Sequence, residues 1–210
     1  MKKFMNNFRK PQGFLGKLVL CGMNIGHQSL WEWCLSRVDL PKSGRMLDIG
    51  CGGGGMIANL LHAHPDLLAD GFDHSEESLR RSRKVNAEFL GARCNFQQGT
   101  AEKLPYEDNL FDFVTAMESI YFWDDLRTCF CEVNRVLKKS GLFIIGVEAA
   151  DPLDTTWSSR IDGMRIYSPN ELETLLQSAG FSVVLREGEK EKTCLVGQKK
   201  DDNKKPVLKV

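Results

Sequence analysis

The order of apolar and polar positions predicts strands and helices that alternate along most of the chain. Short apolar runs bounded by glycine, proline or aspartate indicate buried strands, whereas apolar residues three and four apart indicate amphipathic helices. The expected strands cover residues 45–50, 67–72, 94–97, 111–117 and 142–147. The expected helices between them cover residues 53–64, 75–90 and 124–137. Such alternation is typical of a parallel sheet with helices on both faces.

The last third of the chain has a different pattern. Residues 168–171 read Ser-Pro-Asn-Glu, a helix start with a capping hydroxyl, a proline at the first helical position and a glutamate at the third. The helix that follows is expected to end at Gly180. Residues 181–186 and 192–198 then form two adjacent strands, a hairpin that finishes the sheet.

The length of 210 residues fits one main domain. We expect a basic, aromatic N-terminal arm and a helix in residues 1–40, forming a lid over the site. The main domain is expected in residues 41–198, and residues 199–210 read as a charged tail.

Composition excludes several classes of protein. Lys plus Arg equals Asp plus Glu at 28 each, which counts against a nucleic-acid binder. No apolar run approaches the roughly 20 residues that span a bilayer, and no secretory signal is apparent, so we expect a cytoplasmic protein without stable membrane insertion. The seven cysteines lack metal-ligand spacing and read as reduced, apolar residues. No metal is expected, and the chain is expected to be a monomer or homodimer.

A glycine-rich turn follows the first buried strand, in the segment Leu-Asp-Ile-Gly-Cys-Gly-Gly-Gly-Gly at residues 47–55. Ligands of open α/β sheets bind at this edge. The glycines also match a dinucleotide fingerprint, but Asp48 would face a pyrophosphate there at a cost of about 1 kcal/mol or more. An ammonium group would gain from the same carboxylate. Asp48 therefore favours a cationic ligand.

A second carboxylate, Asp73, ends the second strand and is placed to accept the hydroxyls of a ribose. The loop at residues 99–102 follows the third strand and would border an adenine. A nucleoside with a cationic amino-acid tail is S-adenosylmethionine. The alternatives at this stage are that Asp73 only caps a helix and that Glu102 is a solvated loop charge.

These segments resemble the class I S-adenosylmethionine-dependent methyltransferase family. The matching segments are residues 47–54, 71–75, 99–105, 111–114 and 135–141. The resemblance implies a Rossmann-like, doubly wound α/β fold with a seven-stranded sheet, mostly parallel with an antiparallel C-terminal hairpin strand. The most similar subgroup is the small-molecule methylases that include quinone C-methyltransferases. Residues 116–121 lack the Asn/Asp-Pro-Pro-aromatic sequence of base-modifying amino-methyltransferases, which argues against a nucleic-acid amine as substrate.

The resemblance also implies a set of cofactor contacts. Asp48 with the first glycines should hold the methionyl part, Asp73 the ribose, and His74 should lie beside the adenine. The full expected set is Asp48, Gly50, Cys51, Gly52, Asp73, His74, Thr100, Ala101, Glu102 and Met117.

The candidate catalytic residues are His27, Tyr121 and Glu118. Glu118 should lie with Met117 beneath the sulfonium. The acceptor is expected beside Tyr121, Phe122 and Trp123, under a roof of Asn24, His27 and Trp31. His27 is the candidate general base, with a structural hydrogen bond as its alternative role, and Tyr121 and Trp123 have the alternative role of core aromatics.

The sequence predicts an S-adenosylmethionine-dependent methyltransferase that acts on a small-molecule acceptor by in-line methyl transfer. Two alternatives remain, a non-catalytic S-adenosylmethionine-binding protein and an NAD-dependent dehydrogenase. An arsenite methyltransferase would need several thiols at one site, which the cysteine spacing does not predict. The acceptor and its attacking atom stay open at this stage.

Overall fold

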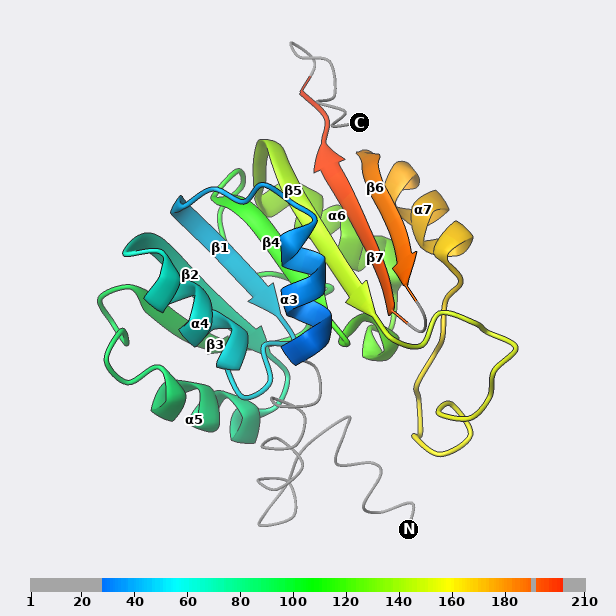
Figure 1. Cartoon of the computed structure of the whole chain (residues 1–210), viewed down its shortest axis with the longest axis horizontal. Helices are drawn as coiled ribbons and strands as arrows, with labels where there is room; N and C mark the ends of the chain where they lie inside the picture. The colour runs from blue at the N-terminus through cyan, green and yellow to red at the C-terminus, as the bar shows by residue number, and fades with distance from the viewer. Residues whose placement is uncertain (1–27, 190–191, 202–210) are drawn as a thin grey trace.

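A twisted sheet of seven strands runs through the middle of the molecule (Figure 1). The computed structural model describes residues 28–189 and 192–201. The strands lie in the order β3-β2-β1-β4-β5-β7-β6. Their bounds are β1 Ser43–Ile49, β2 Asp66–Asp73, β3 Cys94–Gln98, β4 Phe111–Met117, β5 Leu137–Val147, β6 Phe181–Glu189 and β7 Lys192–Lys199. Neighbouring strands from β3 to β5 pair in parallel, and β7 is antiparallel to both β5 and β6.

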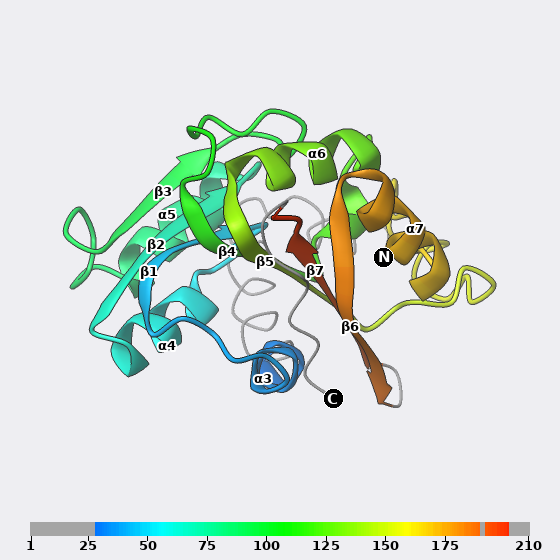
Figure 2. The same ribbon diagram turned by 90° about the horizontal axis from the view of Figure 1, so that it is seen from above.

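Helices cover both faces of this sheet (Figures 1 and 2). One face carries α3 (Gln28–Ser36), α4 (Gly55–Ala63) and α5 (Glu76–Val85). The other carries α6 (Leu126–Val136) and α7 (Pro169–Ser178), and a single 3-10 turn, η1 (Ile120–Phe122), follows β4. In the part of the chain that the structure describes, no helix has the length and apolar character needed to cross a membrane.

Each face of the sheet has its own apolar core. Under α6 and α7, the rings of Phe130 and Phe181 both contact that of Phe143, with centroids 5.2 and 5.8 Å away. On the opposite face, Leu30 and Cys34 of α3 are completely buried. They lie against Gly146 of β5, where an added Cβ would come within 2.9 Å of the Cys34 sulfur. The N-terminal helix is therefore packed onto the sheet.

The predicted fold class is confirmed, including the strand alternation and the C-terminal hairpin. Two element bounds were wrong. The helix expected to reach residue 90 ends at Val85, and Asn86 caps it: the side chain of Asn86 donates hydrogen bonds to the carbonyls of Gly54 and Ser82. The fifth strand begins at Leu137, directly after α6, and passes through Ser140 in a left-handed conformation (φ 63°).

The sheet order determines where a site can form. β1 lies between β2 and β4, and Asp48 is in register with Gly71 on one side and Thr115 on the other. The connection that leaves β1 leads to β2 on one side, whereas the connection that leaves the adjacent β4 leads to β5 on the other side. A crevice forms beyond the carboxyl ends of strands at such a switch point, so a ligand site is expected at this edge of the sheet.

Candidate active site

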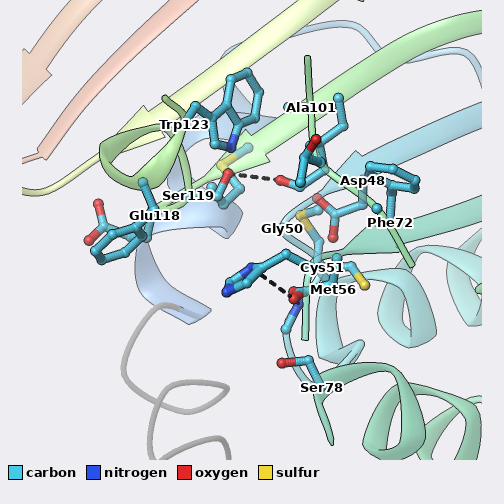
Figure 3. A pocket seen from close by; sticks show the side chains of 18 of the residues that line it. Asp48, Gly50, Cys51, Met56, Phe72, Ser78, Ala101, Glu118, Ser119 and Trp123 are labelled. Carbon is cyan, nitrogen blue, oxygen red and sulfur yellow. Dashed lines mark hydrogen bonds and ion pairs between the residues drawn. The ribbon is translucent and has the colours of Figure 1, made fainter. Parts of the chain in front are cut away.

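A cavity of about 240 Å³ opens at the carboxyl ends of β1, β2 and β4. Figure 3 shows Asp48 and Phe72 on one side of it and Glu118 and Trp123 on the other. Its ionisable side chains include Asp48, Asp73, His74, Glu102, Glu118 and Asp124. Among the described lining residues there is neither a lysine nor an arginine.

The glycine-rich turn forms the floor of the cavity. Gly50 has φ 80° and its N–H donates to the Phe72 carbonyl at 2.7 Å. A Cβ on Gly50 would lie 2.3 Å from the Cβ of Ser119, so this glycine is required by conformation and by space. Gly52 has φ 54°, and a Cβ there would find no atom within 4 Å. Bare backbone is thus open to a ligand at Gly52.

Asp48 reaches the cavity from the end of β1 and is 4% exposed. It accepts a hydrogen bond from the Thr115 hydroxyl at 2.8 Å. Burial raises the pKa of Asp48 to about 7; the Thr115 hydrogen bond lowers it and the negative charge of Asp73 raises it further. A nearby cation stabilises the ionised form of a buried carboxylate whose pKa is raised. This geometry fits an ammonium group at the turn.

Asp73, at the end of β2, lies between the glycine turn and α5. Its carboxylate accepts from the N–H of Gly52 at 3.0 Å and from the N–H of Ser75 at 2.8 Å. His74 Nδ1 lies 3.5 Å from the same carboxylate. Burial raises the pKa of Asp73, against the effect of these hydrogen bonds. Asp48 and Asp73 therefore face one shared cavity.

The loop after β3 forms a third wall. Thr100, Ala101 and Glu102 all line the cavity. Glu102 accepts from the N–H of Asp124 at 3.0 Å, which ties this loop to the segment that leads into α6. The three residues predicted to border an adenine therefore lie on the wall beside Asp73 and His74.

The end of β4 supplies the fourth wall through Met117, Glu118 and Ser119. Glu118 has φ 54°, a left-handed conformation that is uncommon for a residue with a side chain. Its Oε1 accepts from the Tyr121 hydroxyl at 2.9 Å and from the N–H of Glu148 at 2.5 Å. Burial raises the pKa of Glu118 to about 7, although both hydrogen bonds lower it. Backbone strain at a cavity wall is typical of functional positions.

Tyr121 takes the alternative role of a core aromatic, and its expected place on the acceptor side of the pocket is corrected. It is 2% exposed and lies among the core residues under α6, away from the described cavity lining. Its hydroxyl donates to Glu118 and accepts from the N–H of Ala149 at 2.9 Å. Since the ring is held in the core and only the hydroxyl has polar partners, Tyr121 positions Glu118.

The predicted roof is only partly within the described residues. His27 and Asn24 lie outside them. Trp31, from α3, lines the cavity together with Phe122 and Trp123, as expected for the acceptor side. The core alternative for Trp123 also has support, because its ring stacks on Phe143 at 6.5 Å.

Sequence reasoning missed several lining residues. The Ser119 hydroxyl donates to the Ile49 carbonyl at 2.8 Å, and its side chain fills the space where a Cβ on Gly50 would lie. The sequence could have indicated Ser119 only through its position next to Glu118. Ser78 also lines the cavity, although the sequence marked it only as part of a helix start. Met56 falls within the predicted helix at residues 53–64 and Phe72 within the predicted strand at residues 67–72, and neither was predicted to line a cavity. Side chains of this kind are recognised only once the strand ends have been brought together.

The cysteines that the structure describes do not assemble into a metal site. Among residues 28–189 and 192–201, no cluster of three His, Cys, Asp or Glu side chains has the arrangement needed to hold a metal ion. Cys51 lines the cavity with its sulfur 3.8 Å from the Ser82 hydroxyl, and burial raises the pKa of its thiol well above the usual value. A neutral thiol in this position acts as an apolar wall.

Comparison with known proteins defines the class of the domain. The model of a family described as a methyltransferase domain matches residues 47–145. The chain is 31% identical over 120 residues to the ubiquinone/menaquinone biosynthesis C-methyltransferase UbiE of Desulfotalea psychrophila, covering 57% of this chain and 48% of that protein. The chain thus spans about half the length of this relative.

Two solved structures have the same fold. A structure from Thermotoga maritima, titled a SAM-dependent methyltransferase and possible histamine N-methyltransferase, has a TM-score of 0.66 at 26% identity, over 82% of this chain and 89% of that one. CalO1, a methyltransferase in calicheamicin biosynthesis in its SAH-bound form, has a TM-score of 0.66 at 21% identity, over 83% of this chain and 55% of that one.

Residues 47–145 therefore form a methyltransferase domain, and the predicted resemblance to class I S-adenosylmethionine-dependent methyltransferases is confirmed. Within that class, the chain is similar to quinone C-methyltransferases, as the sequence had indicated.

Proposed function

We propose that this protein transfers a methyl group from S-adenosylmethionine to a small-molecule acceptor. The observation that carries the proposal is the pair of buried carboxylates, Asp48 and Asp73, that face one cavity across a glycine turn. A pyrophosphate would meet both charges without a lysine or arginine among the described lining residues. A nucleoside with an ammonium-bearing tail matches them, which favours this function over the dehydrogenase alternative.

Each wall of the cavity has a part in holding the cofactor. Asp48 accepts the ammonium, and the turn from Gly50 to Gly52, with open backbone at Gly52, receives the methionyl chain. Asp73 accepts the ribose hydroxyls, and its existing contact with the Gly52 N–H keeps the carboxylate aimed at the turn. His74, Cys51 and the loop of Thr100, Ala101 and Glu102 surround the base. When bound, S-adenosylmethionine supplies an electrophilic methyl group on a sulfonium.

The acceptor side is built to align a nucleophile and to exclude water. Trp31, Phe122 and Trp123 supply apolar walls beside Met117, and aromatic faces also favour the sulfonium charge. Glu118 is the proton acceptor, because its pKa of about 7 suits transfer near neutral pH. Tyr121 holds the Glu118 carboxylate in place through its hydroxyl. Residues 1–40 form the lid, with His27 as a second candidate base.

The names of the similar proteins leave the attacking atom open. The relative from Desulfotalea psychrophila is named for carbon methylation of a quinone precursor, whereas the Thermotoga maritima title names a nitrogen acceptor. What supports a small acceptor here is the similarity to proteins whose printed names give small acceptors, in quinone biosynthesis and as a possible histamine N-methyltransferase. We further propose that the protein acts in the cytoplasm as a monomer or homodimer, without nucleic acid as a partner.

Isothermal titration of the full chain with S-adenosylhomocysteine and with NAD⁺ tests the cofactor assignment. We expect S-adenosylhomocysteine to bind and NAD⁺ to bind at least a hundredfold more weakly. Asp73→Asn should weaken S-adenosylhomocysteine about tenfold or more through the ribose contact. Preferential binding of NAD⁺ would contradict the proposal.

Catalysis is tested separately, with methyl-labelled S-adenosylmethionine and a metabolite extract. Transfer of label to a small molecule supports the enzyme, whereas cofactor binding without any transfer supports the non-catalytic alternative. In the same assay, His27→Ala should lower turnover while cofactor affinity stays nearly unchanged. A variant with wild-type turnover would remove His27 from the mechanism.

A further inference from the structure

Among the described lining residues, the charged side chains that remain on the acceptor side after the cofactor is placed are acidic. Asp48 and Asp73 are used by the cofactor in the proposed function. Glu102 lies in the loop assigned to the base, so Glu118 and Asp124 remain, and no described lining residue is a lysine or arginine. An anionic acceptor would therefore meet carboxylates on the described walls without a matching cation. A positively charged acceptor would be attracted by these carboxylates, and a neutral acceptor would not be repelled by them.

Glu118 is arranged to bind a donor. Both of its hydrogen bonds, from Tyr121 and from the N–H of Glu148, end on Oε1. No described residue donates a hydrogen bond to Oε2, and Glu118 is partly exposed on the cavity wall. The backbone φ of 54° is a conformation that costs free energy in a residue with a side chain. A carboxylate with one oxygen held by two hydrogen bonds, and with no described donor to the other oxygen, can bind an N–H donor.

Aromatic side chains lie on the same wall as this carboxylate. Trp31 comes from α3, and Phe122 and Trp123 follow Glu118 within the same turn of chain. Aromatic faces attract cations, and the attraction is stronger where water is excluded. A carboxylate together with indole and phenyl rings is a set of groups suited to an alkylammonium ion.

We propose that the methyl acceptor is a small amine whose nitrogen is bound by Glu118. This inference rests on the proposed function. The bound alkylammonium ion loses one proton to the Glu118 carboxylate, and the lone pair freed on nitrogen forms the new bond to the methyl carbon, so the product is a methylated ammonium ion. The carbon–sulfur bond breaks with its electron pair left on sulfur, so the sulfonium becomes a neutral thioether. The proton on Glu118 passes to solvent as product leaves, which restores the carboxylate.

Three probes with the same phenylethyl group separate the possible charges of an acceptor. They are phenethylamine as the cation, 3-phenylpropionate as the anion and 2-phenylethanol as the neutral compound. Each is titrated into the full chain saturated with S-adenosylhomocysteine. We expect phenethylamine to bind at least tenfold more tightly than either of the other two.

Two variants identify the group that recognises the charge. Glu118→Gln should lower phenethylamine affinity at least tenfold and leave 2-phenylethanol within twofold of wild type, because only the charge is removed. Glu107→Gln is the matched control, since Glu107 is exposed and away from the described lining, and it should leave all three affinities within twofold.

The outcomes distinguish this inference from the function on which it rests. A protein that fails to bind S-adenosylhomocysteine overturns the proposed function itself. If the protein binds S-adenosylhomocysteine normally, but phenethylamine binds no better than the other probes or does not bind up to millimolar concentration, only the amine assignment is overturned. Unchanged phenethylamine affinity in Glu118→Gln overturns the assignment in the same way.

Discussion

At the scale of single residues, Gly50 is where conformation and space are most restrictive. Its φ of 80° and the Ser119 Cβ, 2.3 Å from where an added Cβ would lie, act together. We predict that Gly50→Ala destabilises the protein by roughly 2–5 kcal/mol, from the left-handed conformation and from overpacking. It should also lower S-adenosylhomocysteine affinity at least tenfold, because the turn must shift. Urea unfolding and calorimetric titration measure the two effects.

Gly91 provides the matched control for this substitution. Its φ is 79°, almost the same as that of Gly50, but a Cβ there would have no atom within 4 Å. Gly91→Ala should therefore cost only about 1–2 kcal/mol and leave ligand affinity unchanged. Equal losses of stability in the two variants would show that the contact with Ser119 is unimportant.

A second prediction at the residue scale concerns the protonation of the Asp48 carboxylate. In the ligand-free protein its pKa is about 7, and an ammonium ligand favours the ionised form. S-adenosylhomocysteine affinity should therefore rise about tenfold between pH 6 and pH 8, as the fraction of ionised Asp48 grows. Asp48→Asn should remove most of this rise, whereas Glu118→Gln should keep it because Glu118 lies on the other side of the cavity. A rise that persists in Asp48→Asn would assign the titration to another group.

At the scale of elements, the loop between β3 and β4 is held on α6 by one arginine. Arg135 donates to the carbonyls of Leu104 and Tyr106 at 2.9 and 2.7 Å and forms a bidentate pair with Glu132. Glu132 in turn accepts from the N–H of Leu104 at 2.8 Å. These bonds fix the wall that carries Ala101 and Glu102, so the planar guanidinium acts on the site from outside the cavity.

We predict that Arg135→Lys destabilises the protein by about 1–3 kcal/mol, because an ammonium cannot replace the fork geometry. S-adenosylhomocysteine affinity should fall several-fold as the loop loosens. Arg127→Lys, at an exposed position on the same helix, is the control and should change neither property. Denaturation and titration of both variants check the prediction, which fails if the two behave alike.

The element scale also shows where sequence reasoning was reliable. Capping residues such as Ser168 and Ser75 marked helix starts correctly, because the cap is a local interaction. The ends were less predictable: α5 stops where Asn86 reaches the Gly54 carbonyl, a contact with a distant turn. Tyr121 was misplaced for a similar reason, since its hydroxyl contacts Glu118 and Ala149 while its ring enters the core.

At the scale of the whole molecule, the sequence predicted the sheet and the shared position of Asp48 and Asp73, because parallel strands bring their carboxyl ends to one edge. It did not predict that Glu118 would adopt a left-handed conformation or that Ser78 would line the cavity. Those features depend on packing between elements far apart in the chain. Local patterns therefore specified the framework and the charged groups, whereas the shape of the acceptor side required the assembled structure.

The buried carboxylates also link the stability of the whole molecule to pH. Burial raises the pKa of Asp48 and of Glu118 to about 7, above their usual values near 4, so the folded state binds protons more tightly than the unfolded chain. Their contribution to stability is fully present below about pH 4 and is lost as pH rises through 7. The change for Asp48 alone is at most about 4 kcal/mol. We therefore predict that ligand-free protein becomes easier to unfold in urea between pH 5 and pH 8.

Isosteric variants identify the groups responsible. Asp48→Asn and Glu118→Gln should each flatten the dependence of the unfolding free energy on pH between 5 and 8, and the double variant should flatten it further. Asp125→Asn is the control, because the pKa of Asp125 is shifted downward rather than upward. Hydrogen bonds from Thr128 lower the pKa of this helix-capping carboxylate, so it is ionised in the folded and unfolded states over that pH range. Asp125→Asn should therefore leave the slope unchanged. Saturation with S-adenosylhomocysteine should reduce or reverse the wild-type slope, because the ammonium stabilises ionised Asp48. A wild-type slope in the double variant would mean that these two carboxylates titrate alike in the folded and unfolded chain, and the electrostatic argument for a cationic ligand would lose its basis.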